Sequence, residues 1–320
     1  MKSSGDVVFI DEFQYLRNAS KILKAVYDSS SKVKVFSSGS SSIEIHKHLK
    51  ESLAGRRLLF RIHPLQYSEL KTKLSMPLTR YLCYGGMPGL THTDSAERKR
   101  LILSELLSAY ILKDVKSLLK EENIRAFNHL LCLLAQNQGS VVSVHAIAQE
   151  IQMSSKAVNR YLEILEQTFV NFRVHSFSRN LGNELKKSSK YYMYDSGIRN
   201  AILKDFSALG ERTDKGAILE GFVFLRLHTL LAPNVEIRFW RTKDGDEMDF
   251  VLLKDRKPLP IEVKSSLSNP KVSRGLRRFL LRYPETANAI VVNERHDATV
   301  ACGKCAVRFL TFEAFSSFTL

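Results

Sequence analysis

The stretch FWRTKDGDEMDF (239–250), followed by PLPIEVKSS (258–266), decides how the C-terminal part of the chain is interpreted. Both stretches contain residues that favour β-strands, and the charged residues between them indicate a tight turn. A turn over residues 255–256 would pair Asp249 directly with Glu262 on the neighbouring strand. The sequence therefore predicts a β-hairpin that brings two carboxylates together.

A lysine and a third acid accompany this pair. Lys264 lies two residues after Glu262, so both side chains point to the same face of the predicted sheet. Glu220 lies inside the apolar run ILEGFVF (218–224), which predicts a helix. Repulsion between Asp249 and Glu262 is removed if a divalent cation bridges them. The alternative is an ordinary hairpin in which Lys264 neutralises Glu262.

Glu220, Asp249 and the sequence Glu262-Val-Lys264 resemble the core of PD-(D/E)XK nucleases. The resemblance implies that the three acids bind Mg²⁺, which lowers the pKa of a bound water. It also implies that Lys264 orients this water or helps to deprotonate it, so that a phosphodiester is cleaved. Basic residues around the predicted helix at 271–282 would contact phosphates in either case: Arg241, Lys243, Lys271, Arg274, Arg277, Arg278 and Arg282.

A second candidate site lies in VVFIDE (7–12), where four apolar residues precede Asp11 and Glu12. A buried strand that ends in two carboxylates is costly unless the charges are used. In a nucleotide hydrolase, the first carboxylate holds Mg²⁺ and the second polarises the attacking water. By themselves these residues also fit a strand end whose acids begin a helix. VKVFSSG (33–39) is another predicted strand that ends in polar residues.

The stretches FIDEFQYLRN, FSSGSSS, SLAGR and HPLQYSEL resemble, in order and approximate spacing, the ATP-binding domain of archaeal and bacterial AAA+ ATPases. The pattern GxxxxGK[ST] occurs nowhere in the 320 residues, so the phosphate-binding loop would lie before Met1. We therefore expect ATP binding by this chain to be impaired. The resemblance implies that Asp11 and Glu12 are the Walker B pair. It implies a sensor role for one of Ser38, Ser40 and Ser41, and it makes Arg56 a candidate phosphate-sensing arginine.

Residues 125–205 follow the order helix, helix, turn, helix, hairpin, which is typical of a winged helix. The helix at 154–168 would offer four residues to a groove of DNA: Ser155, Lys156, Asn159 and Arg160. The basic residues of the wing would be Arg179, Lys186, Lys187 and Lys190. The alternative is a module that packs against neighbours or mediates protein contacts.

The composition agrees with a nucleic-acid partner. The chain has 48 Lys+Arg against 33 Asp+Glu, a formal charge of +15, and neutralising phosphates would release counterions. A basic surface kept for solubility is the alternative. No apolar run reaches about 18 residues and no signal peptide is recognisable, so we expect a cytoplasmic protein without a membrane partner. The pair Cys302 and Cys305 predicts neither a disulfide framework nor a zinc site. Oligomerisation is left open.

These patterns predict an α/β multidomain chain with four parts. They are a partial P-loop/AAA+ α/β sheet (1–75), a helical region (76–124), a winged helix (125–205) and a PD-(D/E)XK endonuclease-like α/β domain (206–320). In the first part we expect strands at 7–10, 33–39 and 57–65 and helices at 18–28 and 43–51. Two functions stay open: a DNA-associated, Mg²⁺-dependent enzyme, or a non-catalytic DNA-binding or regulatory protein with vestigial ATPase and nuclease sites.

Overall fold

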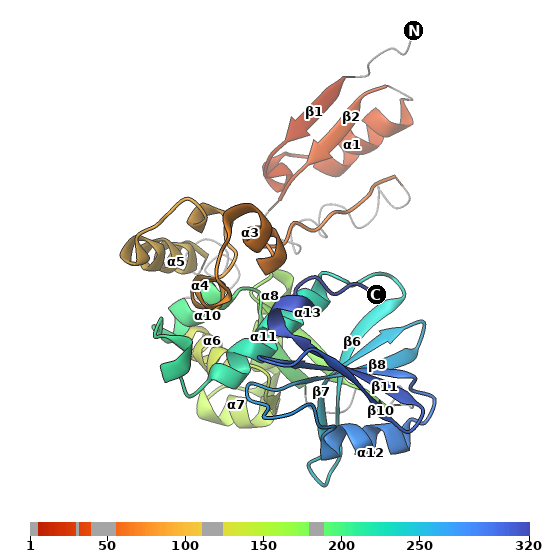
Figure 1. The fold of residues 1–320 in the computed structure, drawn as a ribbon. Coiled ribbons are helices and arrows are strands. Elements are labelled where there is room, and N and C mark those ends of the chain that lie inside the picture. The colour runs from red at the N-terminus through yellow and green to blue at the C-terminus, as the bar shows by residue number, and fades with distance from the viewer. Residues whose placement is uncertain (1–5, 30–31, 40–55, 111–123, 179–188) are drawn as a thin grey trace. The chain divides into compact units, whose positions relative to one another are not determined.

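The structure is a computed structural model that describes residues 6–29, 32–39, 56–110, 124–178 and 189–320 (Figure 1). It contains two compact units, which are described separately. One comprises Met1–Ile62 with Glu163–Val170, and the other His63–Leu162 with Asn171–Leu320. Within the described ranges, no helix combines the length and the apolar character that crossing a membrane requires.

The first unit contains a two-stranded parallel sheet and a crossover helix. Strands β1 (Val7–Ile10) and β2 (Lys34–Ser37) pair in parallel, and they are connected through the 3-10 helix η1 (Phe13–Tyr15) and helix α1 (Ala19–Asp28). Phe13 and Ala19 are buried at its small core. The strands expected at 7–10 and 33–39 and the helix expected at 18–28 are confirmed.

The strand expected at 57–65 was wrong. These residues form neither helix nor strand, and Leu58, Phe60 and Ile62 have exposed fractions of 84%, 74% and 89%. An apolar run becomes a strand only where a neighbouring strand pairs its backbone N–H and C=O groups, and none of the described strands does so. The helix expected at 43–51 lies outside the described residues.

Helices dominate residues 66–138 of the second unit, as the sequence predicts. The 3-10 helix η2 (Pro88–Leu90) begins within the sequence YGGMPG (84–89), where the helical pattern is interrupted. The helices of this unit are α3 (Tyr67–Leu74), α4 (Leu78–Tyr84), α5 (Ala96–Tyr110), α6 (Ile124–Gln136), α7 (Val144–Glu150), α8 (Ser155–Gln167), which begins in it, α10 (Ser196–Leu203), α11 (Lys215–His228), α12 (Arg274–Arg282) and α13 (Phe312–Phe315), with the 3-10 helix η5 (Leu209–Glu211).

A mixed nine-stranded sheet forms the centre of the second unit, in the order β10-β11-β9-β8-β7-β6-β4-β5-β3. β4 pairs in parallel with β6 through only two residue pairs, His175 with Arg238 and Ser176 with Phe239. The edge strand β10 was not predicted. The strands are β3 (Val141–Val142), β4 (Asn171–Ser176), β5 (Ser189–Met193), β6 (Val235–Arg241), β7 (Glu247–Lys254), β8 (Lys257–Val263), β9 (Asn288–Asn293), β10 (Ala298–Cys302) and β11 (Cys305–Thr311).

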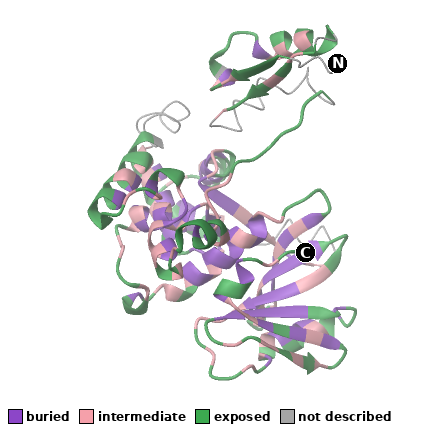
Figure 2. Cartoon of the chain, turned by 45° about the horizontal axis from the view of Figure 1, so that its top comes forward, coloured by how far each residue is buried: buried purple, intermediate pink, exposed green. Residues whose placement is uncertain are grey.

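Helices α11 and α12 cover opposite faces of this sheet, whose strands are largely buried (Figures 1 and 2). On one face, Phe224 of α11 stacks on Tyr192, and its ring centroid lies 6.3 Å from that of Phe250. On the other, Phe279 of α12 packs in a core that includes Val251. Neighbouring residues of β7 thus point to different helices, as the two-residue period of a strand requires.

The turn between β7 and β8 has the predicted register. Lys254 pairs with Lys257, and the ladder continues to Phe250 opposite Ile261. Both turn residues, 255 and 256, have positive φ, of 50° and 65°. This is the backbone of a type I′ turn, whose twist matches that of the flanking strands. The hairpin and its register are therefore confirmed as far as Phe250 and Ile261. The direct pairing predicted for Asp249 and Glu262 is not part of this ladder, because the pairing of β7 with β6 is irregular at Asp249.

The sequence YGGMPG has a packing role. Gly85 has φ +76°, and a Cβ there would lie 2.0 Å from Oδ1 of Asp195. Gly86 donates its N–H to Oδ2 of Asp195 at 2.7 Å, and a Cβ on Gly86 would lie 2.0 Å from the carbonyl oxygen of Leu65. Asp195 also caps α10 by accepting from the N–H of Ile198. Only glycine allows these close approaches.

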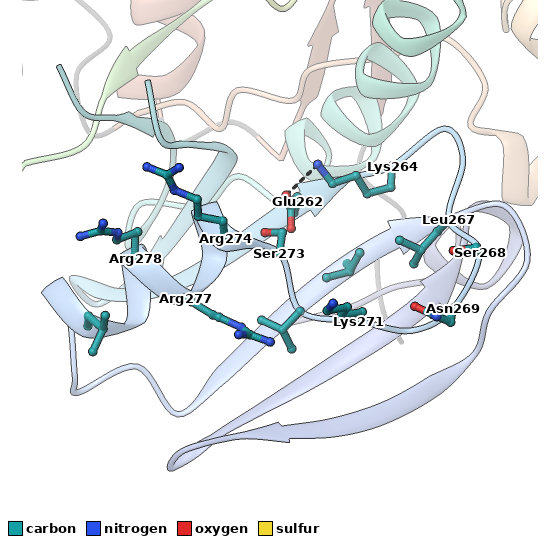
Figure 3. A pocket seen from close by; sticks show the side chains of 13 residues that line it. Glu262, Lys264, Leu267, Ser268, Asn269, Lys271, Ser273, Arg274, Arg277 and Arg278 are labelled. Atoms are coloured by element: carbon teal, nitrogen blue, oxygen red, sulfur yellow. Dashed lines mark ion pairs between the residues drawn. The ribbon is translucent and has the colours of Figure 1, made fainter. Parts of the chain in front are cut away.

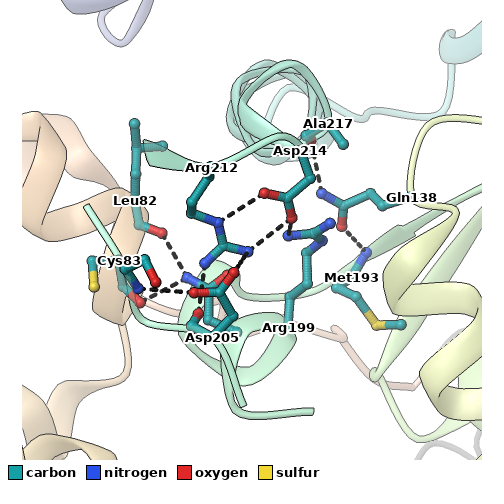
Figure 4. A network of polar contacts seen from close by, with 11 residues as sticks. Leu82, Cys83, Gln138, Met193, Arg199, Asp205, Arg212, Asp214 and Ala217 are labelled. Carbon is teal, nitrogen blue, oxygen red and sulfur yellow. Dashed lines mark hydrogen bonds and ion pairs between the residues drawn. The ribbon is translucent and has the colours of Figure 1, made fainter. Parts of the chain in front are cut away.

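A buried polar network joins α4, α10 and the start of α11 (Figure 4). Arg199 Nη1 and Arg212 Nη2 each lie 2.8 Å from Oδ2 of Asp214. Burial alone would raise the pKa of Asp214, but hydrogen bonds from Arg212 and Arg199 outweigh it and lower the pKa to about 2. Asn200 donates to the carbonyl oxygens of Leu82 and Cys83. This network holds α4 and α10 against the start of α11, the helix that covers one face of the sheet.

Candidate functional site

Asp249 lies in a β-bulge. Two residues of β7, Asp249 and Phe250, face the single residue Phe239 of β6. A bulge re-aims a side chain and is frequent beside active sites. Here Oδ2 of Asp249 accepts the backbone N–H of Val263 at 2.7 Å, so the carboxylate lies where β7 and β8 meet. From this position Asp249 interacts electrostatically with Glu262 of β8.

Glu262 lies on β8 and Lys264 directly follows this strand, and both side chains line the same groove as residues of α12. Lys264 Nζ lies 2.8 Å from Glu262 Oε1, and the Glu262 side chain has an exposed fraction of 7%. The other oxygen, Oε2, is buried and accepts no hydrogen bond from the described residues. A buried carboxylate oxygen without a donor is costly, and it is also the type of atom that binds a divalent cation. The carboxylate of Glu262 is therefore a suitable ligand for a metal ion.

Lys190 lies at the centre of the other acids. Its Nζ is 3.1 Å from Glu220 Oε1, 2.5 Å from Glu247 Oε1 and 3.9 Å from Asp249 Oδ1, and its side chain has an exposed fraction of 1%. Tyr192, two residues later on β5, donates its hydroxyl to Glu220 Oε1 at 2.5 Å. The expectation that Lys190 belongs to an exposed, DNA-contacting wing was wrong. The side chain of Lys190 is buried between β5 and the acids of α11 and β7.

The protonation of these groups follows from burial and charge. Burial raises the pKa of Asp249, repulsion by Glu220 raises it further, and Lys190 opposes the rise, so the pKa lies at about 7. Burial alone would lower the pKa of Lys190 and of Lys264. Attraction to Glu220, and to Glu262 respectively, outweighs burial, and both pKa values are raised. Both lysines are therefore ammonium ions at neutral pH.

The predicted acids converge without forming a finished ligand cage. Asp249 interacts electrostatically with both Glu220 and Glu262. In the part of the chain that the structure describes, however, no three His, Cys, Asp or Glu side chains are grouped closely enough to hold a metal ion. The reason is visible in the contacts of Glu220, whose Oε1 is engaged by Lys190 and Tyr192. Glu262 differs from Glu220 in that its Oε2 accepts no hydrogen bond from the described residues.

A groove of about 810 Å³ opens beside Glu262 and Lys264 (Figure 3). Arg274 Nε lies 3.2 Å from Oδ1 of Asp246, which fixes the first turn of α12 at the rim. The groove combines a buried acid at one position with cations along its wall, which suits a phosphate backbone. The cationic lining residues are Lys264, Lys271, Arg274, Arg277 and Arg278.

In the first unit, the structure brings two predicted ATPase residues together. The Ser38 hydroxyl donates to Oδ1 of Asp11, which also accepts the backbone N–H of Glu12. Glu12 has a left-handed backbone with φ 47°. Arg56, predicted to sense phosphate, forms an ion pair with Asp28 at 3.1 Å. Ser40 and Ser41 lie outside the described residues.

The predicted recognition residues of α8 share an exposed surface. Lys156, Asn159 and Arg160 are exposed, and the hydroxyl of Ser154 caps the helix by accepting the N–H of Ala157 at 3.2 Å. Arg179, Lys186 and Lys187 lie outside the described residues.

Sequence reasoning missed Lys190, Tyr192 and Glu247 as parts of the acid cluster. Lys190 belongs to KYYMYD, in which a charged residue begins an apolar strand, and Glu247 lies two residues before Asp249. A lysine in an otherwise buried strand indicates a buried ionic partner. The partner itself, Glu220, is 30 residues away, so spacing along the sequence could not identify it.

Three family models match parts of the chain. A family model described as an AAA domain matches residues 1–71. Two families described as domains of unknown function match residues 76–209 (DUF8612) and 215–310 (DUF4143). The first of these matches makes the N-terminal part of the chain similar to AAA-type ATPases.

Several curated relatives resemble most of the chain. An uncharacterized protein of Mycobacterium tuberculosis is 26% identical over 91% of this chain and 65% of its own length. An uncharacterized protein of Methanocaldococcus jannaschii is 28% identical over 85% of this chain and 64% of its own length. One from Haemophilus influenzae is 25% identical, with 82% and 67% covered. The chain thus spans about two thirds of the length of the curated relatives it matches.

Proposed function

We propose that this chain is an ATPase-like protein whose C-terminal sheet carries a divalent-cation-dependent site for hydrolysis of phosphodiester bonds in DNA. One observation carries the proposal: the bare Oε2 of Glu262 lies beside Lys264 at the edge of a groove lined with cations. A buried acceptor without a donor, an ammonium and a phosphate-binding wall are the parts that this chemistry needs.

The charge balance of the site supports a bound cation. Four carboxylates face two buried or half-buried ammonium groups, and Asp249, whose pKa lies at about 7, is fully charged only above that pH. One uncompensated negative charge is left below this pH and two above it, in a region of low dielectric. Arg241 Nε lies 3.8 Å from Glu247, but its side chain is 49% exposed, and water screens its charge. A divalent cation would balance the site. The carboxylates are Glu220, Glu247, Asp249 and Glu262, and the ammonium groups are Lys190 and Lys264.

Each residue then has a definable role. Asp249 and Glu262 would hold Mg²⁺ or Mn²⁺, which supplies an activated water when bound. Lys264, whose raised pKa keeps it protonated, orients this water and attracts the scissile phosphate; a proton-accepting role would require the neutral amine. Arg277 and Lys271 bind phosphates further along the strand.

The middle of the second unit supports an additional DNA contact. The order α6, β3, α7, α8, β4, β5, with β5 antiparallel to both β3 and β4, supports the proposal of a winged helix. Lys156, Asn159 and Arg160 would then face a groove of DNA. In the first unit, Asp11 with Ser38 supports a site for Mg²⁺ and ATP.

Plasmid cleavage tests the proposal. Purified protein is incubated with supercoiled plasmid and Mg²⁺ or Mn²⁺, beside Lys264→Ala and, as a charge-matched control, Lys257→Ala. Lys257 is exposed at the start of β8, the strand that ends directly before Lys264, and it lies outside the groove. We expect cutting by the parent and by Lys257→Ala only. Equal retardation of DNA by all three proteins without cutting would instead select the alternative, a DNA-binding protein with a vestigial site.

A further inference from the structure

Lys190 is among the most completely buried large side chains of the described residues. Strand β5 holds it rigidly, because its backbone pairs with Val141 of β3 on one side and Val174 of β4 on the other. Its ammonium therefore has a fixed position among the carboxylates of α11 and β7.

This position determines which acids are free. Lys190 Nζ and the Tyr192 hydroxyl share Oε1 of Glu220, at 3.1 and 2.5 Å, and Lys190 contacts Glu247 at 2.5 Å. Asp249 is held less closely, at 3.9 Å, and Glu262 forms its ion pair with Lys264. The ammonium thus binds Glu220 and Glu247 closely, whereas Asp249 and the Oε2 of Glu262, which accepts no hydrogen bond from the described residues, can bind a further ligand.

We infer that Lys190 is a resident cation of the site, which keeps the acids together when no metal is bound and competes with a divalent cation for them. The inference rests on the proposed metal site. Glu220 and Glu247 serve as anchors of Lys190, and the ion is held by Asp249 and Glu262. A positive charge 3.9 Å from Asp249 opposes the approach of a second cation. The site is therefore stable without metal and binds the ion more weakly than its four acids would alone.

Lys190→Met tests this inference, because methionine keeps most of the side-chain volume and removes the charge. Thermal unfolding is measured in EDTA and in Mn²⁺, and Mn²⁺ affinity is measured by calorimetry. The control is Lys215→Met, which removes another lysine ion pair, at 2.5 Å from Glu294, away from these acids.

We expect Lys190→Met to unfold at a lower temperature in EDTA, since removing one partner leaves buried charges uncompensated. Mn²⁺ should raise its unfolding temperature more than that of the parent, and its Kd for Mn²⁺ should fall at least tenfold. Lys215→Met should match the parent in both Mn²⁺ measurements. If Lys190→Met does not fold in EDTA, recovery of folding by Mn²⁺, but not by NaCl of equal ionic strength, supports the inference.

Two negative results have different meanings. If the parent binds Mn²⁺ and Lys190→Met, or the more conservative Lys190→Gln, binds it no more tightly, Lys190 is only a structural ion-pair partner and the inference is overturned. If neither the parent nor the variants bind Mn²⁺, the proposed metal site itself is refuted.

Discussion

Replacing Asp249 by asparagine should make the protein more stable at pH 8 and have little effect at pH 4. The pKa of Asp249 lies at about 7, above its ordinary value of 3.8, mainly because of burial and repulsion by Glu220. Because the folded state binds the proton more tightly than the unfolded chain, the stabilisation by this group is complete below about pH 4. It is lost as the pH rises through 7.

The magnitude follows from the two pKa values. Their difference corresponds to about 4 kcal/mol of destabilisation once Asp249 is ionised in both states. About 2 to 3 kcal/mol of this loss falls between pH 5 and pH 8. Asparagine keeps an oxygen that can accept the N–H of Val263, so the hydrogen bond at the bulge can persist.

The assay is urea unfolding of the parent and Asp249→Asn in EDTA at pH 5 and pH 8. The stability difference should move by about 2 kcal/mol in favour of the variant between these pH values. Asp244→Asn, at an exposed position on the preceding loop, should show no such change. Added Mn²⁺ should stabilise the parent more at pH 8 than at pH 5 and should not stabilise Asp249→Asn. A difference that is independent of pH would refute the reasoning.

Three further outcomes are expected. Gly86→Ala places a Cβ 2.0 Å from a backbone carbonyl and should cost about 2 to 4 kcal/mol in chemical unfolding, whereas Gly89→Ala, with open space around it, should cost less than about 1. Arg277→Ala should weaken DNA binding and reduce the slope of log K against log salt by about 1, and Arg308→Ala, on a strand outside the groove, should not. Hydrogen bonds from Arg212 and Arg199 lower the pKa of Asp214 to about 2, so the contribution of the Asp214 carboxylate to the free energy of unfolding is present above pH 4 and lost as the pH falls towards 2. Asp214→Asn should therefore cost about 2 kcal/mol or more at pH 7, and less at pH 3, in urea unfolding.

Local patterns predicted much of the C-terminal sheet. The turn residues and the alternation on both sides fixed the register of β7 and β8, and the spacing of Glu262 and Lys264 fixed their common face. The bulge at Asp249 could not be predicted, because it depends on how β6 pairs with β7.

Contacts between distant segments explain the failures. Residues 57–62 have the apolar pattern of a strand, but pairing depends on a neighbour that the pattern does not specify. Lys190 looked like part of a basic loop because its charged neighbours precede it directly. Its burial depends on α11 and β7, which follow it by about 30 and 60 residues.

The two-residue junction of β4 with β6 has a consequence for dissecting the chain. A fragment that started at residue 206 would carry Asp249, Glu262 and Lys264, yet it would lack both Lys190 and Tyr192. It would also uncover the edge of β6, which is prone to pair with other molecules. The smallest piece that can be produced on its own must therefore include β4 and β5, even though the acids that it is meant to display lie in the last third of the sequence.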